Sequence, residues 1–171
     1  PADLPDGPYA DAAAALLGIT GEWNGQVVIR DDRSRQLVTR ALRVRNELAA
    51  DGLHLVTHRE VPDAAAPGHR RGMDVTWADP RSGALRIASF TGTGFTDQRY
   101  RISRFENADP WNWTIVAYSA PAAGGPAGEG SDLRMTLTRG GNRLSWRLDL
   151  RDADGEFDFR RQMTLDKDTA P

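Results

Sequence analysis

The segment Gly21-Glu22-Trp23-Asn24-Gly25-Gln26-Val27-Val28-Ile29-Arg30-Asp31 (residues 21–31) is where the hydrophobic pattern of the chain changes from helical to extended. Before it, residues 10–17 are strong helix formers, and Gly18 suits the position after a helix end. After it, apolar and polar residues alternate, and turn residues interrupt the alternation about every ten positions. The sequence therefore predicts a short N-terminal helix, with Pro8 at its first position, followed by a series of β-strands.

The alternating part of the chain divides into ten expected strands. Their ranges are 21–31, 36–48, 52–61, 71–78, 84–92, 95–106, 111–119, 132–139, 143–151 and 156–165. Because short turns join most of them, sequential strands are expected to pair, and closure removes the two edges that would remain. We predict an all-β antiparallel up-and-down barrel of about ten strands, although a two-sheet sandwich would show the same alternation. We divide the chain into an N-terminal segment with the helix, residues 1–20, and a single barrel domain, residues 21–166.

Composition excludes several classes of function. The chain has 171 residues and a net charge of −2, and its 21 arginines and one lysine are interspersed with acidic residues. Nucleic-acid binding needs clustered positive charge, so we expect none. The chain has no cysteine, which excludes disulfides, thiolate catalysis and cysteine-based zinc sites. No segment approaches the ~20 apolar residues of a membrane-spanning helix.

The polar residues 1–8 look like the start of an exported protein, so we expect a periplasmic or secreted location, with the cytoplasm as the alternative.

Gly21-Glu22-Trp23, placed after a short helix at the start of the first strand, resembles the Gly-x-Trp signature of the calycin superfamily, with Trp23-Asn24-Gly25 as its continuation. That superfamily contains lipocalins, fatty-acid-binding proteins and nitrobindin-like barrels. The resemblance implies that Trp23 lies across the closed end of the barrel, with an arginine of the last strand packed on its ring.

Arg161 is the predicted partner of Trp23 in this structural clasp. Its position has the same parity as four apolar residues of the last strand, so we expect its side chain to point inward. These residues are Phe157, Phe159, Met163 and Leu165. An inward guanidinium needs a partner that offsets its desolvation, and a tryptophan ring can supply one.

The histidines bear on the choice of cofactor. Nitrobindin-like proteins bind haem through a histidine near the end of the chain. The last histidine here is His69, so we expect no haem, and we predict no other cofactor. On a strand, His54 and His58 would stand ~13 Å apart, too far to share a metal, so we predict no metal site. No motif identifies a reaction, and we assign no catalytic residue.

Four aromatic residues and one arginine are the predicted ligand-binding residues. Trp77, Tyr100, Trp113 and Trp146 have inward parity, and they either line an internal cavity or pack as core. Arg40 shares parity with Val38, Leu42 and Val44. It either anchors a carboxylate, as inward arginines do in fatty-acid-binding proteins, or reaches water at the barrel mouth.

Three hypotheses for function follow. The first is a non-enzymatic binding protein that holds a small apolar or amphipathic ligand inside the barrel, with or without one anionic group. The second is an isomerase or lyase with its site in the barrel mouth, for which Tyr100 and Arg40 are the candidate groups. The third is a structural or interaction module with a filled barrel.

Overall fold

The computed structural model describes residues 8–31, 34–64, 70–79, 83–119 and 132–168. These residues form one helix and ten strands, with bounds close to those expected from the sequence. They are α1 (Pro8–Leu17), β1 (Gly21–Arg30), β2 (Leu37–Leu48), β3 (His54–Glu60), β4 (Arg71–Asp79), β5 (Ala84–Thr91), β6 (Gly94–Asp109), β7 (Asn112–Ser119), β8 (Leu133–Gly140), β9 (Arg143–Arg151) and β10 (Phe157–Lys167). The helix α1 is neither long nor apolar enough to cross a membrane.

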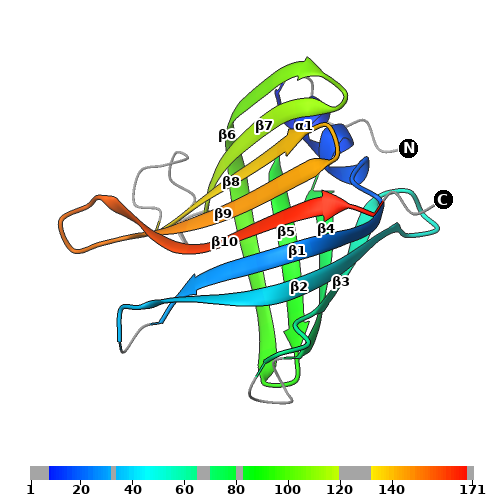
Figure 1. Cartoon of the computed structure of the whole chain (residues 1–171). Coiled ribbons are helices and arrows are strands. Elements are labelled where there is room, and N and C mark those ends of the chain that lie inside the picture. Colours follow the sequence, from blue (N-terminus) through cyan, green and yellow to red (C-terminus); the bar gives the residue numbers. More distant parts are fainter. Residues whose placement is uncertain (1–7, 32–33, 65–69, 80–82, 120–131, 169–171) are drawn as a thin grey trace.

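The ten strands close into one antiparallel barrel, which confirms the predicted fold class and excludes the sandwich. Each strand pairs with its sequence neighbours, and β1 pairs with β10 to complete the circle. In Figure 1, β4, β5 and β6 run steeply behind β1, β2 and β10, which lie across the front. The barrel therefore has two walls whose strands cross at a large angle, and the interior lies between them.

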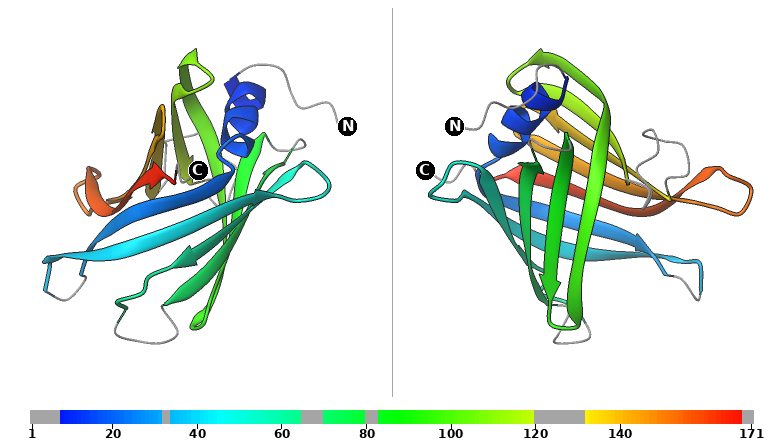
Figure 2. Two further views of the ribbon diagram at one scale, coloured as in Figure 1. Left: turned by 45° about the vertical axis from the view of Figure 1, so that its right-hand side comes forward. Right: turned by 180° about the vertical axis from the view of Figure 1, so that it is seen from behind.

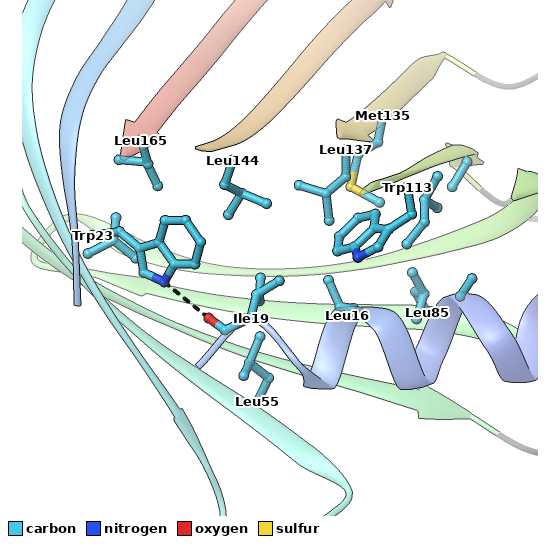
Figure 3. Close-up of a cluster of buried hydrophobic side chains, with 14 of the residues drawn as sticks. Leu16, Ile19, Trp23, Leu55, Leu85, Trp113, Met135, Leu137, Leu144 and Leu165 are labelled. Atoms are coloured by element: carbon cyan, nitrogen blue, oxygen red, sulfur yellow. Dashed lines mark hydrogen bonds between the residues drawn. The ribbon is translucent and has the colours of Figure 1, made fainter. Parts of the chain in front are cut away.

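One end of the barrel is closed by α1, which lies against that end in both views of Figure 2. Ala12, Leu16 and Ile19 are buried in the same core cluster as Trp23, Leu55 and Leu85. Figure 3 shows Leu16 and Ile19 beneath Trp113 and Trp23, with the Trp23 ring nitrogen donating to the carbonyl of Ile19 at 3.2 Å. The helix is thus held by its apolar face, as the short run of helix formers before Gly21 allows.

Trp23 lies at this closed end, fully buried, but its cationic neighbours differ from the prediction. The guanidinium of Arg139 lies 5.9 Å from the ring centroid, and the ammonium of Lys167 lies 5.8 Å from it. Arg161 pairs with Ile29, six positions along β1 from Trp23, which corresponds to ~20 Å. The prediction that Arg161 stacks on Trp23 is therefore wrong.

A β-bulge in β10 explains why the parity argument for the last strand failed in part. The register shifts between Phe159, which is opposite Asp149, and Arg161, which is opposite Leu148. Because Arg160 is the extra residue of the bulge, Phe157 and Phe159 point outward while Arg161 points inward. The inward orientation of Arg161 was thus predicted correctly, whereas that of the two phenylalanines was not.

In β4 the inward face is the reverse of the one predicted. Gly72, Asp74 and Thr76 face the interior, so Trp77 lies on the outer surface. There its ring contacts the guanidinium of Arg86 at 4.8 Å and the ring of His54 at 5.7 Å. The assignment of Trp77 to the ligand cavity is therefore wrong.

Candidate functional site

The interior of the barrel contains a cavity of about 700 Å³. Leu16 and Ile19 form its floor at the closed end, and the cavity extends to Arg40 and Arg71, whose side chains are exposed. A volume of this size lies within the range of small-molecule binding sites in proteins. The interior is therefore not filled by side chains, contrary to what the structural-module hypothesis expects.

The strands β8, β9, β10, β1 and β2 form what we call the apolar wall of the cavity. Apart from Arg40, Asn46 and Arg161, their described inward side chains are aliphatic, sulfur-containing or aromatic. The principal ones are Val27, Leu42, Leu137, Trp146, Leu148 and Met163. Such a surface favours the apolar part of a ligand, because contact removes both surfaces from water.

The strands β3, β4, β5 and β6 form the opposite, polar wall. Most of their inward side chains carry a hydroxyl, amide or charged group. The principal ones are Thr57, Asp74, Thr76, Ser89, Gln98 and Tyr100. The cavity thus presents a different chemistry on each side.

Three of the four arginines that line the cavity have carboxylate partners. Arg40 lies 3.8 Å from Asp63 and Arg71 lies 3.8 Å from Glu60, both near the mouth. Deeper, Arg59 donates from Nη2 to Asp74 Oδ1 at 2.8 Å, and its Nε lies 2.6 Å from Oδ2. Gly72 lies opposite Arg59 in the register, and a Cβ there would lie only 3.1 Å from Arg59 Nη2, so glycine leaves room for the guanidinium.

Arg161 is the fourth of these arginines and is held differently. It projects from the apolar wall, its Nε is buried, and within the described residues that nitrogen has no hydrogen-bond partner. Burial lowers the pKa of Arg161, and the nearby cations of Arg59 and Arg160 act in the same direction, whereas the charge of Asp74 and then Tyr100 act in the opposite direction. The group nevertheless stays charged at any physiological pH, since arginine does not deprotonate in proteins. The cavity therefore contains a charge that an anionic ligand would stabilise.

Tyr100 lies near Arg161 on the polar wall and is 1% exposed. Its hydroxyl donates to Oε1 of Gln98 at 2.6 Å. Burial raises the pKa of Tyr100 to about 12, although Arg161 acts in the opposite direction. The phenol is therefore neutral near pH 7 and serves as a hydrogen-bonding group.

The five predicted ligand-binding residues fall in different places. Tyr100, Trp146 and Arg40 line the cavity, the last of them near the mouth, where it also donates to the backbone oxygen of Asp63 at 3.3 Å. Trp113 faces inward but packs against Leu16 in the core at the helix end (Figure 3). Trp77, as described above, is outside.

Sequence reasoning missed the pair Arg59 and Asp74 and gave Arg161 a different role. The available signal was the run of polar residues at inward positions of β4, namely Gly72, Asp74 and Thr76. The assumption that apolar residues face inward assigns the wrong face to such a strand when the strand forms a polar wall of a cavity.

The described side chains that could take part in acid–base catalysis already have partners. Among the described cavity residues, the Asp74 carboxylate is engaged by Arg59, and Tyr100 keeps its proton to about pH 12. Tyr100 and Arg40 also have separate partners, Gln98 and Asp63. Among the described residues, the site thus offers polar contacts and a fixed positive charge, and its Asp74 carboxylate is already paired with Arg59.

The histidine ligand that the nitrobindin-like resemblance would imply for haem is absent from the described residues of the cavity. His54 and His58 lie on the outer face of β3, where His54 Nδ1 is 2.6 Å from Asp51 Oδ2. His69 lies outside the described residues. No described residue therefore supplies an imidazole ligand to the interior.

Comparisons with known proteins support the fold. No family model matches the chain, and no curated protein matches it. Among solved structures, the fold is similar to that in "Crystal Structure of Rv2717c from M. tuberculosis", with a TM-score of 0.60 and 15% sequence identity. The match covers 96% of this chain and 99% of the other. The likeness thus extends over nearly the whole of both chains and concerns the fold.

Proposed function

We propose that this protein is a non-enzymatic binding protein that holds a small, mainly apolar ligand with one anionic group inside the barrel. The observation that carries the proposal is the Arg161 guanidinium, which reaches into a cavity of about 700 Å³ without a carboxylate partner among the described residues. A buried charge without a counter-charge lowers the stability of the folded protein unless a group of opposite charge, such as a ligand carboxylate, lies beside it.

The number of charges in the cavity favours a single anionic group on the ligand. Arg40, Arg59 and Arg71 each have a carboxylate within 4 Å, and Arg161 alone among the lining arginines does not. One carboxylate on the ligand would therefore balance the described interior. A second anionic group placed deep in the cavity would meet the Asp74 carboxylate, which repels it.

The rest of the cavity suits an apolar body. Trp146 and the aliphatic side chains of the apolar wall surround the space between Arg161 and the floor formed by Leu16 and Ile19. Each methylene group placed there contributes about 0.8 kcal/mol. A ligand with an alkyl or ring portion would thus gain affinity from this wall and orientation from Arg161.

The test is a calorimetric titration with laurate and with its methyl ester, which has the same chain and no charge. We expect laurate to bind more tightly, and Arg161→Leu to weaken laurate about tenfold to a hundredfold while changing the ester little. Arg40→Leu separates the two arginines, because a mouth residue paired with Asp63 should matter less. Arg104→Leu, an exposed residue on the outer face of β6, is the matched control. Absence of laurate binding, or equal laurate affinity in wild type and Arg161→Leu, would contradict the proposal.

A further inference from the structure

The polar wall of the cavity carries hydrogen-bonding groups that a ligand with a bare alkyl chain would leave unused. Within the described residues, the hydroxyls of Thr76 and Ser89 have no hydrogen-bond partner. Gln98 accepts from Tyr100 through Oε1, which leaves its Nε2 free to donate into the cavity. Three donor or acceptor groups are thus directed at the space that the ligand would occupy.

These groups lie close together on adjacent strands. Thr76 on β4 and Gln98 on β6 flank the same position of β5, Ile87, and Ser89 is the next inward residue of β5. Neighbouring strands are ~4.8 Å apart and successive inward residues ~7 Å apart, so the three groups form one patch. Tyr100 follows Gln98 on the inward face of β6 and lies near Arg161, so the patch adjoins the surroundings of Arg161.

Several other polar groups on this wall are already engaged. Thr57 donates to Asn46 Oδ1 at 2.7 Å, and Arg59 and Asp74 pair with each other. The hydroxyls of Thr76 and Ser89 and the Nε2 of Gln98 therefore differ from these engaged groups in having no partner among the described residues. An alkyl chain pressed against it would desolvate each group without replacing its hydrogen bonds, at ~1–3 kcal/mol per group.

Resting on the function proposed above, we infer that the ligand class is an oxygenated amphipathic carboxylate. Its carboxylate lies at Arg161, one side of its carbon skeleton is apolar and faces β8–β10 and β1, and the other side carries hydroxyl or carbonyl oxygens that face Thr76, Ser89 and Gln98. The two walls of the cavity match the two sides of such a molecule. A simple fatty acid matches only one of them.

The test compares laurate with a set of monohydroxylaurates whose hydroxyl stands at successive positions along the chain. At least one hydroxylated acid should bind about two- to tenfold more tightly than laurate, which corresponds to one neutral hydrogen bond. The double variant Thr76→Val with Ser89→Ala keeps the shape of both side chains and should reduce or abolish this preference. Thr114→Val, which changes a threonine bonded to Thr138 away from the cavity lining, should retain it.

The outcomes separate the two proposals. If laurate binds and no hydroxylated acid binds more tightly, the inference is overturned while the binding function stands. If a preference exists but survives in the double variant, the assignment to the hydroxyls of Thr76 and Ser89 is overturned. If neither laurate nor any hydroxylated acid binds, the proposed function itself fails. Should the double variant not fold, Ser89→Ala alone provides the same comparison.

Discussion

Arg139 and Arg161 are two arginines directed into the barrel, and their surroundings predict opposite effects on stability. Arg139 is 3% exposed, and it donates to the carbonyls of Gly141 at 3.1 Å and Gly18 at 3.3 Å. Its guanidinium also lies 4.4 Å from the ring centroid of Trp111. Each guanidinium has one buried nitrogen without a hydrogen-bond partner among the described residues, Nη2 in Arg139 and Nε in Arg161, but Arg161 has no bonds to backbone carbonyls like those of Arg139.

We therefore expect Arg139→Leu to lower the free energy of unfolding by about 2 kcal/mol or more, because two carbonyls lose their donors. Arg161→Leu should leave the stability of the ligand-free protein unchanged or raise it, because it removes a poorly paired charge. Urea titration of the two variants measures both effects. A larger loss of stability for Arg161→Leu would mean that Arg161 has a structural role.

Tyr100 gives a prediction for alkaline pH. Its pKa is raised to about 12 in the folded protein by burial, whereas an unfolded tyrosine ionises near pH 10. Between these values the unfolded chain loses a proton that the folded protein keeps, so stability falls as pH rises. Tyr100→Phe should remove up to about 3 kcal/mol of this alkaline loss and have a small effect at pH 7.

Tyr9 provides the comparison for that experiment. Its pKa is also raised to about 12, by burial and by the charge of Asp79, and its hydroxyl donates to the Ala84 carbonyl at 3.1 Å. Tyr100→Phe should therefore retain a weaker pH dependence that Tyr9→Phe reduces further. Denaturant midpoints recorded from pH 9 upward would contradict the account if Tyr100→Phe and wild type showed the same slope.

At the scale of elements, the closure of the barrel depends on Gly25. A Cβ at this position of β1 would lie 2.0 Å from the backbone oxygen of Thr164 in β10, a contact that no side chain could relieve. We expect Gly25→Ala to destabilise the protein by several kcal/mol or to prevent closure. At Gly140 a Cβ meets nothing within 4 Å, so Gly140→Ala should change stability by less than about 0.5 kcal/mol. Thermal unfolding of the pair measures this, and equal midpoints would show that β1 can move away from β10.

The strands also show which structural features the sequence predicts and which it does not. Period-two alternation and turn residues were sufficient for the ten strands, and helix formers ahead of Gly18 were sufficient for α1. These signals were not sufficient for β10. A bulge at Arg160 places Phe159 and Arg161 on opposite faces, and the residue types around it do not indicate a bulge.

The error in β4 has a physical cause that bears on function. Met73, Val75 and Trp77 are the large apolar residues of this strand, and burial in a solid core would turn them inward. Here Asp74 and Thr76 face inward, because Asp74 pairs with Arg59 across a cavity wall. Local sequence rules are expected to fail where residues serve a site, and the polar wall is where they failed.

At the scale of the whole molecule, the fold and the presence of an inward arginine on the last strand could be predicted, whereas which inward arginine lacks a carboxylate partner could not. Arg40 and Arg161 both have inward parity. Only the three-dimensional arrangement shows that Arg40 is paired with Asp63 near the mouth, whereas Arg161 lies beside Tyr100. Which arginine is already neutralised depends on residues far apart in sequence.

The most direct measurement of the central claim is an NMR titration of laurate labelled at its carboxyl carbon and bound in the barrel. A carboxylate beside Arg161 should have a pKa below that of the free acid, because the nearby cation stabilises its charged form. At ligand concentrations that saturate both proteins, the pKa of the bound carboxyl should be higher in Arg161→Leu than in wild type. Equal carboxyl pKa values in the two proteins, or a bound carboxyl that titrates like the free acid, would contradict the placement of the anion at Arg161.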